Sequence, residues 1–200
     1  MRRTAGMTLL EVLIANAIFL LLLGAVFLIY AQGSSAWRKG AIQAELLQQL
    51  QVISLRVGSN LEQSIYSSLT VTPSGDAVSF LVSAGSSSID PQTGYPSWSS
   101  YEIFYHKGQE LLQRDVPLSP SARERTRPGP IEGYSPDAGG PQPLTAYLKG
   151  GRVVARRIKS FRVEHIPTTQ LIRLTAMAEI EPLHQDRPEK STLSTLVRLR

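Results

Sequence analysis

The amino-acid sequence predicts an α+β fold in which a long amino-terminal helix packs on an antiparallel β-sheet. Three features of the 200-residue chain lead to this prediction. Val12 to Ala31 is a run of twenty almost entirely apolar residues, Trp37 to Tyr66 carries an amphipathic helical pattern, and from Leu69 onward apolar and polar residues alternate as in strands. The chain has no cysteine, which excludes disulfides, cysteine-ligated zinc and thiol nucleophiles.

The apolar run is long enough to cross a membrane. At about 1.5 Å per residue its twenty residues form roughly 30 Å of helix, the thickness of a bilayer core. The alternative is a cleavable secretory signal, but such a signal has an apolar core of only about 7–15 residues. Arg2 and Arg3 precede the run and favour a cytoplasmic amino terminus by the positive-inside rule. We therefore expect a single-pass membrane protein whose carboxyl-terminal domain lies outside the membrane.

The segment 33–68 is predicted to form an amphipathic helix that packs on the sheet. Its apolar residues recur at intervals of three and four, the spacing of one helical face. They are Ile42, Leu46, Leu50, Ile53, Val57, Leu61 and Ile65. Gly33-Ser34-Ser35 is a weak point, so this helix is either continuous with the membrane helix at 7–32 or a separate helix in line with it.

Residues 69–200 are predicted to form an antiparallel sheet domain. Strand patterns, some joined as hairpins, lie at 69–72, 77–84, 100–106, 109–116, 152–166, 170–180 and 192–200. In 170–180 apolar residues alternate with largely polar ones, which indicates one buried and one solvated face.

Two long loops interrupt this domain, at 85–100 and 117–143. The second contains seven prolines and four glycines and almost nothing to bury. We therefore expect deletion of part of Ser121–Pro141 to leave the stability of the domain nearly unchanged. Loops of this kind on a rigid sheet commonly carry recognition.

The amino terminus resembles a known family. Arg2 and Arg3, then Gly6, then Met7-Thr8-Leu9-Leu10-Glu11 and a long apolar helix are similar to the class III leader of type IV pilins and type II secretion pseudopilins. The resemblance implies a leader at 1–6, removed by a prepilin peptidase that cuts between Gly6 and Met7, and methylation of the new amine. It also implies that Glu11 serves assembly. Met7 stands where the family most often has phenylalanine.

Glu11 lies at the edge of the apolar run, where a carboxylate needs a partner. An ionised carboxylate in hydrocarbon costs on the order of a few kcal/mol unless it reaches the headgroups or a cation. The amine of Met7 in a neighbouring subunit, shifted by about one helical turn, would be such a cation, and in a low dielectric the attraction is strong. The alternative is a carboxylate that only extends toward the headgroups.

The carboxyl half is similar to J-type minor pseudopilins and W-type minor pilins. The likeness rests on the hairpin YEIFYHKGQELLQRDV, the strand KSFRVE and the terminal TLSTLVRLR. Many major pilins have a proline in the membrane helix, whereas the first proline here is Pro73, which favours a minor subunit in a priming or tip complex. The resemblance implies as partners a prepilin peptidase, other minor subunits, the major subunit and the inner membrane, with a periplasmic or cell-surface filament as the destination.

No catalytic, nucleotide or metal motif occurs, so we expect neither an enzyme nor a cofactor. An unrelated signal-anchored enzyme remains an alternative that failure of peptidase processing would favour. The loop carboxylates lack the spacing of a calcium loop and are expected to be solvated. They are Asp90, Glu124, Glu132 and Asp137.

A DNA- or surface-binding receptor subunit is the second alternative. Basic residues could contact phosphates, and Trp98 and several tyrosines could stack on bases. The basic residues are Arg123, Arg125, Arg127, Arg152, Arg156, Arg157, Lys159 and Arg162. Without Arg2 and Arg3 the charge balance is 19 against 16, a mild excess, and a strand with outward arginines explains 152–166 more simply.

Overall fold

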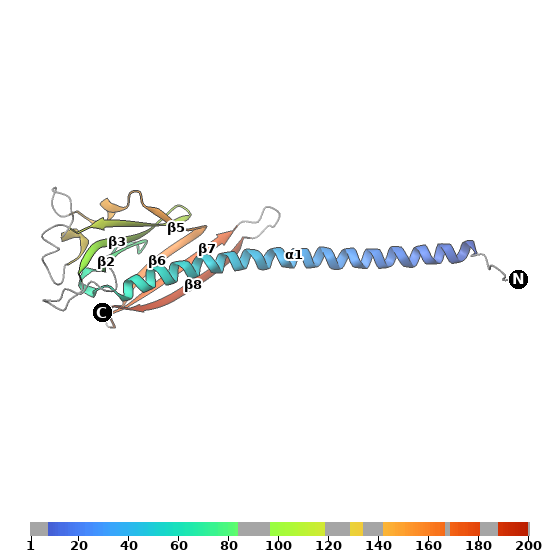
Figure 1. Cartoon of the computed structure of the whole chain (residues 1–200), viewed down its shortest axis with the longest axis horizontal. Coiled ribbons are helices and arrows are strands. Elements are labelled where there is room, and N and C mark those ends of the chain that lie inside the picture. The colour runs from blue at the N-terminus through green and yellow to red at the C-terminus, as the bar shows by residue number, and fades with distance from the viewer. Residues whose placement is uncertain are drawn as a thin grey trace. The chain divides into compact units, whose positions relative to one another are not determined.

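The computed structural model describes residues 8–83, 97–118, 129–133, 142–166, 169–180 and 188–199 (Figure 1). The chain divides into two compact units, Met1–Ile42 and Gln43–Arg200. The helix α1 (Leu9–Glu62) belongs to both units, and the strands all belong to the second. The predicted α+β class, a long amino-terminal helix packed on antiparallel sheet, is confirmed.

The helix α1 continues through the predicted weak point. Ser34 Oγ donates to the carbonyl of Ala31 at 3.0 Å, and Ser35 Oγ donates to the carbonyl of Gln32 at 2.8 Å. These bonds give both hydroxyls partners on their own helix, and the helix continues through the two serines. The α-helix ends at Glu62, and the 3-10 turn η1 (Tyr66–Ser68) follows it.

The first sheet has five antiparallel strands in the order β1-β2-β3-β4-β5. They are β1 (Thr70–Val71), β2 (Ala77–Ser83), β3 (Trp98–Lys107), β4 (Glu110–Pro117) and β5 (Arg152–Arg156). The middle of β3 is buried on both faces, so the arrangement of one buried and one solvated face does not apply to this strand. β3 begins inside the predicted loop 85–100; the rest of that loop, 85–96, lies outside the described residues.

The second sheet has three antiparallel strands in the order β6-β7-β8. They are β6 (Ile158–Ile166), β7 (Leu171–Ile180) and β8 (Glu189–Arg198). Residues 152–166 were predicted to form one strand, but they form two strands, β5 and β6, which belong to different sheets. The break is at Arg157, whose φ of 61° turns the chain out of the first sheet. In β7 the predicted apolar face is buried from Ile172 to Ala178.

The carboxyl-terminal part of α1 packs on the sheets through its predicted apolar stripe, and β6 to β8 run beside it in Figure 1. The buried members of this stripe are Leu46, Leu50, Ile53, Val57 and Leu61. Ser54 and Thr195 share a hydroxyl hydrogen bond of 2.9 Å between α1 and β8. A Cβ at Gly58 would lie 3.7 Å from Val197 Cγ2, so α1 approaches β8 closely there.

The expectation that the loop 117–143 has almost nothing to bury is wrong. Ile131, in the 3-10 turn η2 (Ile131–Gly133), is 0% exposed and packs in a cluster with Tyr101, Leu144 and Tyr147. Tyr101 donates its hydroxyl to the carbonyl of Gly129 at 2.8 Å. The described segment 129–133 of this loop therefore packs on the first sheet beside Tyr101. Residues 119–128 and 134–141 lie outside the described part of the chain.

Candidate functional site

The start of α1 holds Glu11 in a reciprocal pair of hydrogen bonds. The backbone N–H of Thr8 donates to Glu11 Oε2 at 2.9 Å, and the backbone N–H of Glu11 donates to Thr8 Oγ1 at 3.3 Å. This is a capping box, which satisfies two amides that the first turn of a helix leaves without partners. The carboxylate is thereby fixed at the amino-terminal end of α1, where the helix dipole favours negative charge.

Thr8 is the residue of this site that the sequence interpretation missed. The signal was present, because Thr8 and Glu11 form the T-x-x-E pattern directly before an apolar run. A carboxylate offers several acceptor positions, so the amide of Thr8 leaves capacity for a further donor. The site can therefore cap its own helix and receive a cation from outside the chain at the same time.

The residues around the expected cleavage point are not placed. Arg2, Arg3, Gly6 and Met7 lie outside the described residues, so their roles stay predictions. Removal of residues 1–6 would leave the Met7–Thr8 peptide bond intact. The capping box of Thr8 and Glu11 would therefore survive cleavage.

On both sides of Glu11 the first unit presents an exposed apolar surface. The large side chains of this stretch are 43% to 82% exposed. They are Leu9, Leu10, Val12, Leu13, Ile14, Ile18, Phe19, Leu20, Leu21, Leu22, Leu23, Val26, Phe27, Leu28, Ile29 and Tyr30. By length and composition α1 can cross a membrane. A helix that is apolar on all sides is stable only among lipid tails or other apolar helices.

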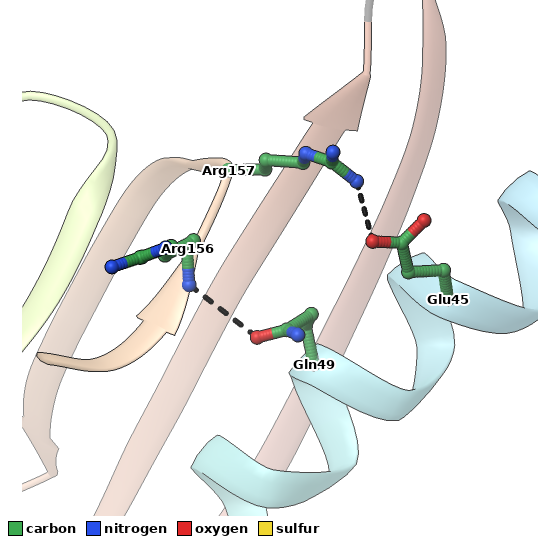
Figure 2. A network of polar contacts seen from close by, with 4 residues as sticks. All are labelled: Glu45, Gln49, Arg156 and Arg157. Atoms are coloured by element: carbon green, nitrogen blue, oxygen red, sulfur yellow. Dashed lines mark hydrogen bonds and ion pairs between the residues drawn. The ribbon is translucent and has the colours of Figure 1, made fainter.

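Four of the basic residues considered for nucleic acid have acidic or amide partners: Arg152, Arg156, Arg157 and Lys159. Arg157 pairs with Glu45 of α1 at 2.5 Å, and the backbone N–H of Arg156 donates to Gln49 Oε1 at 3.3 Å (Figure 2). These contacts fix the segment that crosses between the two sheets to the helix. Arg157 is also the residue whose backbone φ is positive, so its ion pair with Glu45 has a structural role at this bend of the chain.

Two further basic side chains of this set are also paired. Arg156 lies 3.5 Å from Glu110 and Lys159 lies 3.3 Å from Glu179. Each nearby carboxylate lowers the positive potential that a phosphate backbone would meet. Arg123, Arg125 and Arg127 lie outside the described residues.

The aromatic residues proposed to stack on bases are mostly in the core. Trp98 is 9% exposed, and Tyr101, Tyr105 and Tyr147 are each at most 3% exposed. A base cannot stack on a ring that protein atoms already cover. Among the described residues of this domain, Trp98, Tyr101, Tyr105 and Tyr147 therefore offer no stacking surface.

A buried carboxylate, Glu102, lies between α1 and the first sheet. Asn60 Nδ2 donates to Glu102 Oε2 at 2.6 Å, and Gln113 Nε2 donates to Glu102 Oε1. Arg152 Nε in turn donates to Gln113 Oε1 at 2.9 Å. Burial of the carboxyl group raises the pKa of Glu102 to about 6, and the hydrogen bond from Asn60 opposes this rise.

Glu102 should make the stability of the domain depend on pH. Because its pKa is higher in the folded chain than the ordinary 4.5, the folded state binds the proton more tightly. The contribution is complete below pH 4.5 and is lost as the pH rises through 6. From pH values well below 4.5 to values well above 6, the free energy of unfolding should fall in all, relative to Glu102→Gln, by on the order of 2 kcal/mol.

Urea unfolding of a chain comprising Gln43–Arg200, which contains all the buried apolar residues of the described chain, measures this difference. Glu62→Gln, at an exposed position at the end of α1, is the control and should leave the pH profile unchanged. Parallel profiles for wild type and Glu102→Gln would show that Glu102 does not titrate in this range.

No group of three or more potential metal ligands occurs among the described residues. Glu132, one of the loop carboxylates, accepts the backbone N–H of Leu144 at Oε1, 3.2 Å away. It therefore joins the turn η2 to the 3-10 turn η3 (Leu144–Tyr147). Asp90, Glu124 and Asp137 lie outside the described residues.

Comparison with known proteins identifies the amino terminus. A family model of the prokaryotic N-terminal methylation motif matches residues 1–27. The match includes Gly6, Glu11 and most of the apolar run. No curated protein and no solved structure matches the chain.

Proposed function

We propose that this type IV prepilin-like protein, which carries the N-terminal methylation motif at residues 1–27, is a minor pilin or pseudopilin. A prepilin peptidase removes residues 1–6, and the chain then joins a type IV pilus or a type II secretion pseudopilus, in its priming or tip complex. Its long apolar helix and leader fit a single-pass membrane-anchored pilin. The observation that carries the proposal is Glu11, held at the start of an exposed apolar helix.

The proposed orientation places the amino terminus in the cytoplasm and the domain Gln43–Arg200 on the other side of the inner membrane. Arg2 and Arg3 favour the cytoplasm for the leading end, but Arg38 and Lys39 beyond the other end of the run equal them in number, so the leader motif at residues 1–27 is what supports this orientation. Cleavage after Gly6 removes these two charges and creates an amine at Met7. Methylation of that amine keeps its positive charge, so it can still pair with a carboxylate.

The charges at the amino-terminal end of the processed chain, the Met7 amine and the Glu11 carboxylate, drive assembly. In a filament the apolar helices replace lipid contacts with contacts to one another. A neighbour shifted by about one helical turn brings its Met7 amine to Glu11, and a charge pair in this low dielectric is much stronger than in water. The capping box with Thr8 supports the proposal, because it prevents the carboxylate from bending away from the helix axis. The chain acts by joining an assembly, not by turning over a substrate.

The experiment is replacement of Glu11 by valine in the full chain, expressed with the peptidase and partner subunits. Insertion should be unchanged or slightly better, because a charge at the membrane edge is lost. Processing should continue. Association with partners, measured by crosslinking and co-purification from membranes, should be lost, since an unpaired amine in the apolar core costs about 3–5 kcal/mol.

Thr8→Val is the matched control. It removes the hydroxyl that caps the helix, at a cost of about 1 kcal/mol, but leaves the carboxylate of Glu11 in place. We expect this variant to associate with partners nearly as well as wild type. Equal loss in both variants would assign the effect to helix capping. Wild-type association of the Glu11→Val chain would contradict the assembly role altogether.

A further inference from the structure

The first unit carries an aromatic and basic cluster on α1 just beyond the apolar run. It consists of Trp37, Arg38 and Lys39. Trp37 is 80% exposed, and both basic residues are exposed too. The other tryptophan, Trp98, is buried in the sheet domain, so the exposure of Trp37 is not a general property of the tryptophans in this chain.

Helix geometry places this cluster at the depth of lipid headgroups when the apolar run spans the membrane. Trp37 follows Ala31 by six residues, which is about 9 Å along the helix. The polar layer on each side of a bilayer is roughly 5–8 Å thick. Side chains of a helix lean toward its amino terminus, here toward the membrane, so the indole and the two long basic side chains extend back into this layer.

The residues between the apolar run and the cluster are also compatible with a position in the headgroup layer of the membrane. Ser34 and Ser35 donate their hydroxyls to the carbonyls of Ala31 and Gln32 in the same helix. These two hydroxyls therefore have partners without bulk water, as a segment at the edge of the hydrocarbon requires. The helix also continues without a break through this stretch.

We propose that Trp37, Arg38 and Lys39, which follow one another around α1, form a belt that binds anionic phospholipid headgroups and fixes the depth of α1 in the membrane before assembly. The site rests on the membrane-anchored stage of the proposed function. Tryptophan favours the membrane–water interface, because its apolar ring and its N–H meet different surroundings there. The two cations complement lipid phosphate, and each is worth roughly fivefold in lipid association near the surface.

Tryptophan quenching tests the proposal on the full chain reconstituted in vesicles. Phosphatidylglycerol brominated near the headgroup end of its acyl chains should quench Trp37, and Trp37→Phe gives the signal of Trp98 for subtraction. Competition with unlabelled phosphatidylcholine then gives the relative association constant of the anionic lipid. We expect a clear preference for phosphatidylglycerol in the wild-type chain.

The double variant Arg38→Gln, Lys39→Gln should lower this constant by a factor of about 25, the product of two fivefold effects. Lys107→Gln, which removes one charge from β3 in the second unit, is the control and should leave it unchanged. Alkali extraction tests separately whether the chain is anchored in the membrane. If alkali does not extract the chain, equal quenching by the two lipids, or no quenching of Trp37, would overturn the inference but not the membrane anchor. Extraction of the wild-type chain by alkali would overturn both.

Discussion

A chain with Gly6 replaced by leucine is expected to keep its leader. Residues 1–27 match the N-terminal methylation motif, and the cut is predicted after Gly6, where a small residue fits a narrow peptidase pocket. Forcing extra methylene groups into a packed site costs about 1–3 kcal/mol, which slows cleavage roughly fivefold to a hundredfold. Mass spectrometry of the chain, co-expressed with a prepilin peptidase, measures the fraction that begins at Met7.

The same variant should also fail to assemble, although it still inserts. The apolar run and Arg2 and Arg3 are unchanged, so the chain reaches the membrane by the same route. Without cleavage no amine forms at Met7, and Glu11 of the neighbour lacks its partner. Gly6→Ala is the control, because alanine adds a single methyl group and should still be cut. A wild-type chain that begins at Met1 in the presence of the peptidase would refute the processing prediction.

Replacement of Ile131 by alanine is expected to destabilise the domain by about 2–5 kcal/mol, the range for a large-to-small change in a core. Ile131 is 0% exposed and packs between Tyr101, Leu144 and Tyr147. Deletion of Ser121–Pro141 removes the same side chain, so it should be at least as harmful. This expectation reverses the one drawn from the composition of the loop. Urea unfolding of the Gln43–Arg200 chain gives the difference.

Val153→Ala is the matched control for Ile131→Ala. Val153 is an aliphatic residue on β5 and is 39% exposed, so its truncation leaves no comparable cavity. Its effect should stay within about 1 kcal/mol, in keeping with partly exposed positions. Equal destabilisation by the two variants, or none by Ile131→Ala, would show that the loop does not contribute to the core.

At the amino-terminal end, the membrane-length helix and the methylation motif could be recognised from the sequence. Membrane length, leader charge, Gly6 and Glu11 are properties of contiguous residues, and a local pattern is enough to recognise them. The capping box of Thr8 and Glu11 is local as well and could have been predicted from its four-residue pattern. The stripe from Leu46 to Leu61 was predictable because one helical period places these residues on one face.

Only the tertiary structure decided which polar and loop residues are buried. Glu102 looks like an ordinary outward residue of an alternating strand, but α1 covers that face and brings Asn60 to its carboxylate. Ile131 stands alone among prolines and glycines, and only the approach of β3 and η3 from distant parts of the chain encloses it. The break at Arg157 has no glycine or proline to mark it in the sequence. The backbone there adopts a conformation that an isolated arginine seldom adopts, and the ion pair with Glu45 stabilises it. Periodicity reports on neighbours along the chain, whereas these three placements depend on contacts between segments far apart in sequence, which no local pattern encodes.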